Sequence, residues 1–496
     1  MVALAIGSPT KTRAFALLGP VEPWMQATNG VIWAGDIGGP MDIGSGYRWN
    51  VPVVTYGFDQ SFLDYFGTNG VAAVEGAIQI LNDLPPSSQI GLTNYPFHSQ
   101  RINYYAQSLS LIDLKSQTLP LLLEHMGLAQ PTRSIYVLHQ WDPVLADESN
   151  ILLFDVFEGT NFSKFIFTRN YDPQSLSASP YVNDTLYSAK IYIFHNDSHY
   201  ISPFNVDPLA DQNAAVADNA GVGFVGAGVF YDGLTYDDVG GMAYLLSTNN
   251  VNYETLLSDV QGVGTNSFVN GSSRPGVKKI TFLPQPTGLL PGTFLPMTNQ
   301  FTDTYITNGN AIHQQLQRVI TQPDFLFSAG NDSFRTGTTN WINNSALNSN
   351  PTGAGPGIIR PPINIVFQKM GSYFYNPYPF SGPESEDSVQ DVTSSLGAFG
   401  TFDGSTNAPI VYPVPQTGNV TMAIRVLLSH ANSPFFNFQS FEWTPTSLAG
   451  TVYALQTSTN LSNWNSLFVV TNNGSVCTYQ NVNANSPSRF YRLVPQ

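Results

Sequence analysis

Hydrophobic and polar positions alternate with a period of two in several short segments, a pattern typical of β-strands. Near the N-terminus, Val2, Leu4 and Ile6 fall on one side of an extended segment, and Phe15 and Leu17 repeat the pattern. Neither segment has a hairpin partner next to it in the sequence. We therefore expect these strands to pair with distant parts of the chain or with another subunit.

A strand and then a helix are predicted in the next region. The run over residues 51–56 indicates a buried strand. The spacing of apolar residues after it predicts a helix that begins just after Gly67, is capped by Thr68 or Asn69, and ends before Pro85. The apolar residues of this helix are Val71, Val74, Ile78 and Leu81.

Three further helices are expected. One lies between about Gln107 and Met126, and we expect its last part to start near Pro120, because proline suits the first turn of a helix. A short helix is predicted over Ala311 to Thr321 from the spacing of its apolar residues. These apolar residues are Ile312, Leu316 and Ile320.

The clearest helix signal lies between Gly233 and Leu246. Thr235 can cap the helix, and Asp237 and Asp238 place negative charge in its first turn. The paired glycines that follow, residues 240–241, indicate close packing against another backbone.

Other strands are predicted from β-branched and aromatic residues. In the first half of the chain they cover residues 135–138, 151–156, 165–168 and 191–194. Near the C-terminus, five turn-separated strands have the spacing of a small β-sandwich. These cover residues 438–443, 451–456, 464–470, 476–479 and 489–493.

The pattern as a whole predicts an α+β and all-β chain with four parts. We expect an extended N-terminal arm over 1–45, an α+β domain over 46–260, a loop-rich β region with extended Pro/Gly segments over 261–432, and a C-terminal β-sandwich over 433–496. Residues 348–362 are the strongest linker or arm candidate, because prolines and glycines crowd this stretch.

Composition narrows the classes of function. Only 11% of the 496 residues are charged, against about 25% in ordinary soluble domains, and the net charge is -15. Few cations make nucleic acid an unsuitable partner, and no apolar run is long enough to cross a bilayer. A single cysteine, Cys477, excludes disulfides within the chain and Cys-rich metal sites; we interpret it as a small buried hydrophobe. The balance of residues favours a bacterial secreted or surface protein.

Two of the seven histidines are close enough to form a motif. His195 and His199 would share one face of a helix, as the ligands of a zinc hydrolase do, but Asn196 stands where such a site has its general base. The residues before them are β-like. We interpret both as loop histidines, with a metal site as the alternative.

Other candidates for chemistry are weaker. The glycines of Gly221 to Gly228 lack the spacing of a phosphate loop, so we interpret the stretch as a packed strand or turn. Carboxylate pairs for glycoside hydrolysis and calcium-binding loops remain alternatives to ordinary structural or solvated residues. The carboxylate candidates are Asp142 beside Trp141, Asp155 and Glu158; the calcium candidates are the cluster Glu384 to Asp391 and the loop Asp403 to Thr406.

Two stretches resemble parts of known families. Residues 47–81, including the run Val53 to Phe58, are similar to the start of a metzincin, or matrixin-type, protease domain, and Leu234 to Gly241 is similar to the helix that closes it. The resemblance implies a metzincin-like fold. The family's His-Glu-x-x-His motif with a third histidine is absent, so we expect a scaffold without its metal.

The C-terminus resembles a β-module common on secreted proteins of Verrucomicrobia-like bacteria. The resemblance rests on the run Tyr453 to Trp464 and the ending Arg489 to Leu493, and it implies export. The whole chain also resembles uncharacterised secreted proteins of those bacteria.

Together these observations predict a secreted or cell-surface structural protein that self-assembles, as a filament or surface layer, through β-strand addition and extended arms. Its expected partners are copies of itself, and no catalytic residue, metal or cofactor is assigned. The alternative is a divergent secreted zinc metallopeptidase or a carbohydrate-active hydrolase.

Overall fold

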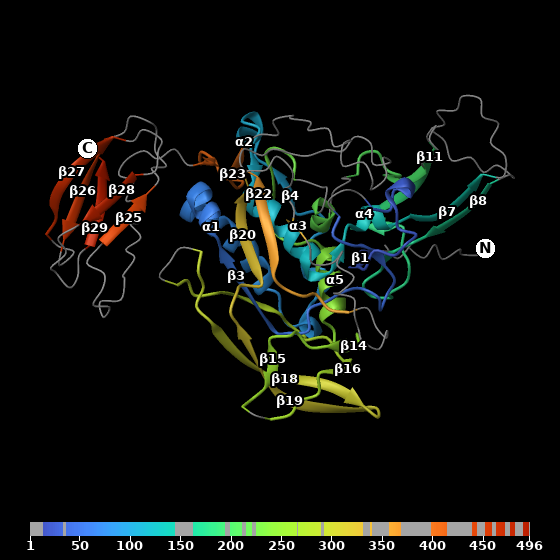
Figure 1. Ribbon diagram of the computed structural model, residues 1–496. Helices are drawn as coiled ribbons and strands as arrows, with labels where there is room; N and C mark the ends of the chain where they lie inside the picture. The colour runs from blue at the N-terminus through green and yellow to red at the C-terminus, as the bar shows by residue number, and fades with distance from the viewer. Residues whose placement is uncertain are drawn as a thin grey trace, which may run out of the picture. The chain divides into compact units, whose positions relative to one another are not determined.

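The computed structural model divides the chain into two compact units, Met1–Val414 and Pro415–Gln496 (Figure 1). Each unit is described by itself. The residues that the structure describes are 13–32, 36–143, 162–193, 199–210, 215–220, 225–264, 266–288, 292–330, 338–339, 357–368, 398–413, 439–443, 452–458, 463–471, 477–481 and 490–495.

A mostly parallel sheet forms the centre of the first unit. Its strand order is β17-β3-β20-β22-β21, and only the pairing of β21 with β22 is antiparallel. The predicted strand over 51–56 is β3 of this sheet, so that prediction is confirmed. The sheet therefore combines a strand from the predicted domain over 46–260 with strands from the predicted region over 261–432. The bounds are Thr281–Pro284 (β17), Val53–Phe58 (β3), Phe325–Gly330 (β20), Ile363–Gln368 (β22) and Thr338–Thr339 (β21).

Helix α1 (Gln60–Asn82) packs against this sheet, but it starts earlier than predicted. Asp59 caps it by accepting a hydrogen bond from the Phe62 N–H at 2.9 Å. Gly67 lies inside the helix at φ 59°, a conformation that glycine adopts without strain, and it kinks the helix. The glycine therefore marks a kink rather than the beginning of the helix.

Helix α3 (Leu114–Met126) also differs from the prediction, because Pro120 lies inside it. The helix begins instead after Asp113, whose carboxylate accepts the Ser116 N–H at 2.9 Å. It continues through the proline because nearly all of its side chains are buried, and tertiary packing then outweighs the lost hydrogen bond. The helix ends at Gly127, at φ 109°, where a Cβ would collide with the Tyr47 carbonyl oxygen.

Helix α5 (Tyr236–Leu246) confirms the clearest helix prediction. Thr235 is the N-cap, and Asp238 completes a capping box. The paired glycines do pack closely, but against side chains rather than backbone: Pro173 meets Gly240, and Leu128 and Phe15 meet Gly241.

The strand predicted around Phe15 and Leu17 is also present. It is β1 (Phe15–Gly19), which is fully buried and pairs antiparallel with β2 (Gly39–Met41), β6 (Leu128–Ala129) and β9 (Asn170–Tyr171). Two of these partners, β6 and β9, are distant in the sequence, as expected, whereas β2 lies in the same N-terminal region as β1. The segment with Val2, Leu4 and Ile6 lies outside the described residues.

A second five-stranded sheet, with the order β14-β16-β18-β19-β15, carries a long hairpin. The strands of this hairpin, β18 (Met297–Thr307) and β19 (Asn310–Ile320), appear in yellow at the lower edge of Figure 1. The helix predicted over Ala311 to Thr321 is therefore wrong, because these residues form β19. The other strands are β14 (Asn252–Thr255), β15 (Val260–Gly262) and β16 (Gly271–Arg274).

The predicted strands around residues 137, 166 and 192 are present in two antiparallel hairpins. These pair β7 (Val137–Pro143) with β8 (Phe162–Phe167), and β11 (Thr185–Ile193) with β12 (His199–Asn205). The strand expected over 151–156 lies outside the described residues. The remaining short elements are β4 (Gln100–Ile102), α2 (Tyr104–Ser108), β5 (Ile112–Asp113), α4 (Pro131–Ser134), β10 (Tyr181–Val182), β13 (Val229–Tyr231), β23 (Phe399–Thr401) and β24 (Ile410–Val411), with 3-10 turns at Ala27–Asn29, Ser87–Gln89, Leu92–Asn94 and Val216–Asn219.

The expected linker over 348–362 enters the core where it is described. Ile358 and Ile359 are 2% and 0% exposed, and the Ile359 N–H donates to the Arg48 carbonyl at 3.0 Å. The end of this Pro/Gly-rich stretch is thus a packed part of the first unit.

All five strands predicted near the C-terminus are present in the second unit. They form two sheets, one of β25 with β28 and one with the order β27-β26-β29. Their bounds are Gln439–Trp443 (β25), Val452–Ser458 (β26), Asn465–Thr471 (β27), Cys477–Asn481 (β28) and Phe490–Pro495 (β29).

The mixture of helices with many strands confirms an α+β and β-rich chain. Among the helices described, none combines the length and apolar character that spanning a membrane requires.

Candidate functional site

The two histidines of the possible metal motif do not share a helix. His199 begins strand β12, where it lies opposite Ile193 of β11. His195 lies outside the described residues. A helical zinc motif needs both imidazoles on one helix face, and a strand residue at the second position does not provide that geometry.

The other candidates divide into those that the structure describes and those that it does not. Asp142 and Trp141 lie on β7, and Cys477 lies on β28, as backbone positions in paired strands. Asp403 is exposed and caps its own turn, accepting the Ser405 N–H at 2.8 Å. Outside the described residues lie Asp155, Glu158, the cluster Glu384 to Asp391, and Gly221 with Gly223.

The described end of the Gly-rich stretch is a turn rather than a phosphate loop. Gly228 has φ 73° and packs against Gln107, and its N–H donates to the Leu111 carbonyl at 2.7 Å. The Val225 N–H donates to the Gln117 side chain at 3.0 Å. These backbone donors are occupied within the protein.

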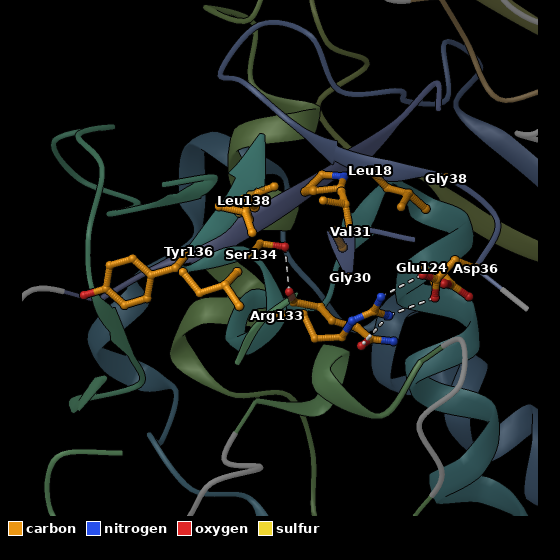
Figure 2. Close-up of a pocket in the computed structure, with 15 residues that line it drawn as sticks. Leu18, Gly30, Val31, Asp36, Gly38, Glu124, Arg133, Ser134, Tyr136 and Leu138 are labelled. Atoms are coloured by element: carbon orange, nitrogen blue, oxygen red, sulfur yellow. Dashed lines mark hydrogen bonds and ion pairs between the residues drawn. The ribbon is translucent and has the colours of Figure 1, made fainter. Parts of the chain in front are cut away.

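A small hollow lies beside α4 (Figure 2). The Arg133 side chain lies beside the carboxylates of Asp36 and Glu124 there. Its guanidinium donates two hydrogen bonds to Asp36, of 2.8 and 2.7 Å. Ser134 donates its hydroxyl proton to the Gln130 carbonyl at 2.8 Å. The volume open to water is about 40 Å³, room for a few water molecules and far below a substrate pocket of roughly 300 Å³ or more.

Buried carboxylates gather at the N-terminus of α5. Asp238 accepts the N–H groups of Val216 and Ala217 at 3.1 and 3.0 Å, and Asp237 accepts that of Asn183. Burial raises the pKa of both carboxyl groups. Their hydrogen bonds fix two chain segments, at Asn183 and at Val216–Ala217, to the helix, which is a structural role.

Several backbone groups of β18 point away from its hairpin partner β19. On the far side of β19, the Val319 N–H donates to the Asp259 carbonyl and the Gln315 carbonyl accepts from Val263. Thr298 lies opposite Val319, and Thr302 lies opposite Gln315. Opposed residues of an antiparallel ladder point their backbone groups either toward each other or both away. The N–H and C=O of Thr298 and Thr302 therefore point outward from β18.

By the same alternation, the backbone groups of Gln300 also point outward. Among the described residues, β16 is the one other strand that pairs with β18, and it does so at a single position, Ser273 opposite Ile306. Thr298, Gln300 and Thr302 are exposed. We call these three residues the open edge of β18.

Within the hairpin, no exposed Lys, Arg, Asp or Glu side chain lies along this edge. The two strands of the hairpin contain one carboxylate, Asp303, and one guanidinium, Arg318, which are 6% and 1% exposed. Asp303 faces Arg274 at 3.2 Å, and Arg318 binds Asp324. An exposed strand edge without lysine, proline or a bulge is a template for pairing with another chain.

The sequence carries a local signal for this hairpin, which the helix prediction for residues 311–321 overlooked. Asn308 and Gly309 form its two-residue turn, at φ 48° and 75°. Asn-Gly between two alternating segments is the strongest short-range indication of a hairpin.

Among the residues described, no three His, Cys, Asp or Glu side chains are placed to hold a metal ion. Comparison of the chain with protein-family models, with curated proteins and with solved structures found no match.

Proposed function

We propose that this chain is a secreted or cell-surface structural protein that assembles with copies of itself through β-strand addition. The observation that carries the proposal is the open edge of β18, whose outward backbone groups pair with no other strand among the described residues and whose hairpin has no exposed Lys, Arg, Asp or Glu side chain. Strand addition uses such groups for affinity.

The low charge of the whole chain supports the same proposal. With 19 cations in 496 residues, the chain has few lysines to guard strand edges or to hold copies apart. A filament or surface layer needs further contacts between copies, and the N-terminal segment with Val2, Leu4 and Ile6 is our candidate for a second one.

We also infer a metzincin-like scaffold without its metal in the first unit, and a β-sandwich in the second. The order of β3, α1 and α5 along the chain supports the first inference. The two sheets of the second unit, with Ala454 and Leu455 buried at 1% and 0% exposure, support the other.

Light scattering on the full chain over a dilution series, with negative-stain microscopy, tests the proposed function. We expect particles of at least two chains that dissociate on dilution. A mass of one chain at every concentration up to the millimolar range would contradict the proposal.

A further inference from the structure

Resting on the proposed self-association, we propose that two copies pair edge to edge through β18. The two β18 strands run antiparallel about a two-fold axis beside Gln300, which joins the two five-stranded sheets into one. The partner is a second copy of this chain.

The register follows from the outward backbone groups. The open edge supplies three outward positions, and an antiparallel pair centred on the middle one uses all three: Gln300 lies opposite Gln300 of the second copy, and Thr298 lies opposite Thr302. Each of these opposed pairs exchanges two backbone hydrogen bonds.

The same register avoids strand β16. That strand occupies the edge at Ile306, and Thr304 beside it is half-buried. In the proposed pair, the last residue of β18 that hydrogen-bonds to the second copy is Thr302 and the last opposed residue is Asp303, so the pairing stops before the position that β16 occupies. A register centred further toward the hairpin tip would bring the second copy into β16.

The side chains along the edge are self-complementary. On the outer face the pairing sets threonine against threonine and glutamine against glutamine, combinations that hydrogen-bond across strands. On the inner face Asn299 lies opposite Phe301, and Met297 lies opposite Asp303. Asp303 is already in contact with Arg274, so no two like charges oppose each other.

Pairing of three residues at an edge gives a modest interface, so the dimer should form reversibly at high protein concentration. It is also a closed contact. Because each copy presents the same edge to the other, the pair uses both edges completely, and any longer assembly has to grow through a different surface.

Disulfide trapping tests the register. The substitution Gln300→Cys, made in a Cys477→Ser background, places two thiols opposite each other at the axis. Their Cα atoms would be about 5.5 Å apart, within the range a disulfide spans. Under mild oxidation we expect rapid formation of a covalent dimer.

Gln317→Cys in the same background is the matched control. Gln317 is the same residue type and lies directly opposite Gln300 on β19, one strand further from the axis. Two such thiols would be too far apart to bond. We expect at least a tenfold greater yield of covalent dimer from Gln300→Cys than from Gln317→Cys, and equal yields would overturn the proposal.

Thr302→Pro provides a second test. The Thr302 N–H points away from β19, so proline removes the outward donor and leaves the hairpin ladder intact. We expect at least a tenfold weaker association. Unchanged association would overturn this register while leaving the proposed function standing, whereas a wild-type chain that never associates would contradict both.

Discussion

Two regions of the second five-stranded sheet differ in charge: the buried arginines and their partners, which we call the base, and the open edge of β18. At the base, Arg48, Arg274 and Arg318 are each about 1% exposed and bind carboxylates or carbonyl groups. At the edge, Thr298, Gln300 and Thr302 are exposed and carry no charge. The chain thus places some of its few cations inside, where they join distant segments, and leaves the three residues of the open edge uncharged.

The buried arginines show what the interior placement achieves. Arg48 binds Glu254 at 2.6 Å and the Arg274 carbonyl at 2.8 Å, and Arg274 in turn faces Asp303. Arg318 binds Asp259 at 2.8 Å and Asp324. These contacts tie the sheet together, although a buried ion pair gives specificity more surely than it gives stability.

The largest effect is expected from breaking the base of the sheet. Arg318→Met removes the partner of Asp324, a carboxylate that is 1% exposed, and leaves it buried without a counter-charge. The free energy of unfolding should fall by about 3–5 kcal/mol, measured by urea unfolding of the full chain. A loss below about 1 kcal/mol would show that the interior placement of this cation is unimportant.

Lowering the pH should raise the free energy of unfolding and leave the association through the open edge unchanged. Burial raises the pKa of Asp113 to about 6 and that of Asp218 to about 7, whereas both carboxyls titrate near 3.9 when unfolded. The folded chain therefore binds these protons more tightly. The free energy of unfolding should rise as the pH falls from about 8 through both folded values, by about 1–3 kcal/mol, and the gain should be complete near pH 4.

Thermal unfolding at several pH values, beside light scattering at the same values, measures both regions. The open edge consists of threonine and glutamine, which do not ionise, so self-association should stay constant between pH 8 and 5. A thermal stability that falls steadily as the pH is lowered from 8 to 5 would contradict the effect expected from Asp113 and Asp218.

A charge introduced at the open edge should weaken association between copies, by a smaller free energy than the loss of stability expected for Arg318→Met. Gln300→Lys sets two ammonium groups opposite each other at the proposed axis, and like charges directly opposed destabilise strand pairing. We expect the dissociation constant to increase at least tenfold, about 1.4 kcal/mol, by light scattering. Gln317→Lys adds the same charge on β19 and should change the constant little.

The smallest effect is expected from an exposed ion pair. Arg101 binds Asp232 at 2.9 Å, but their side chains are 49% and 56% exposed. Arg101→Ala should lower the free energy of unfolding by about 0.5 kcal/mol or less. A loss comparable to that of Arg318→Met would remove the contrast between buried and exposed cations.

The hairpin shows why one part of the fold was misread from the sequence. Ile312, Leu316 and Ile320 recur every fourth residue, which fits one face of a helix and equally one face of a strand. The positions between them on the strand face are Gln314 and Arg318, polar residues that point inward because they have buried partners. Polar residues on the inward face hid the alternation of β19, and with it the open edge of β18.

Local signals predicted other elements well. The five C-terminal strands, β1, β3 and α5 follow from alternation, turn residues and a capping box, all of which lie within a few residues. Pro120 misled because burial against distant segments holds it inside α3, and Gly67 misled because it adopts a positive φ at a kink within α1. The hollow at Arg133 joins segments about a hundred residues apart, which no local pattern could indicate.

The central sheet sets the order in which the chain can fold. Strand β3 at residues 53–58 pairs with β17 and β20, and β20 pairs with β22 at residues 363–368. At roughly 5–20 residues per second, a ribosome needs about 15–60 s to make the chain between β3 and β22. During that time the N-terminal half lacks its core partners. Nascent chains should therefore bind chaperones until late in synthesis, and fragments that end before β22 should fail to fold.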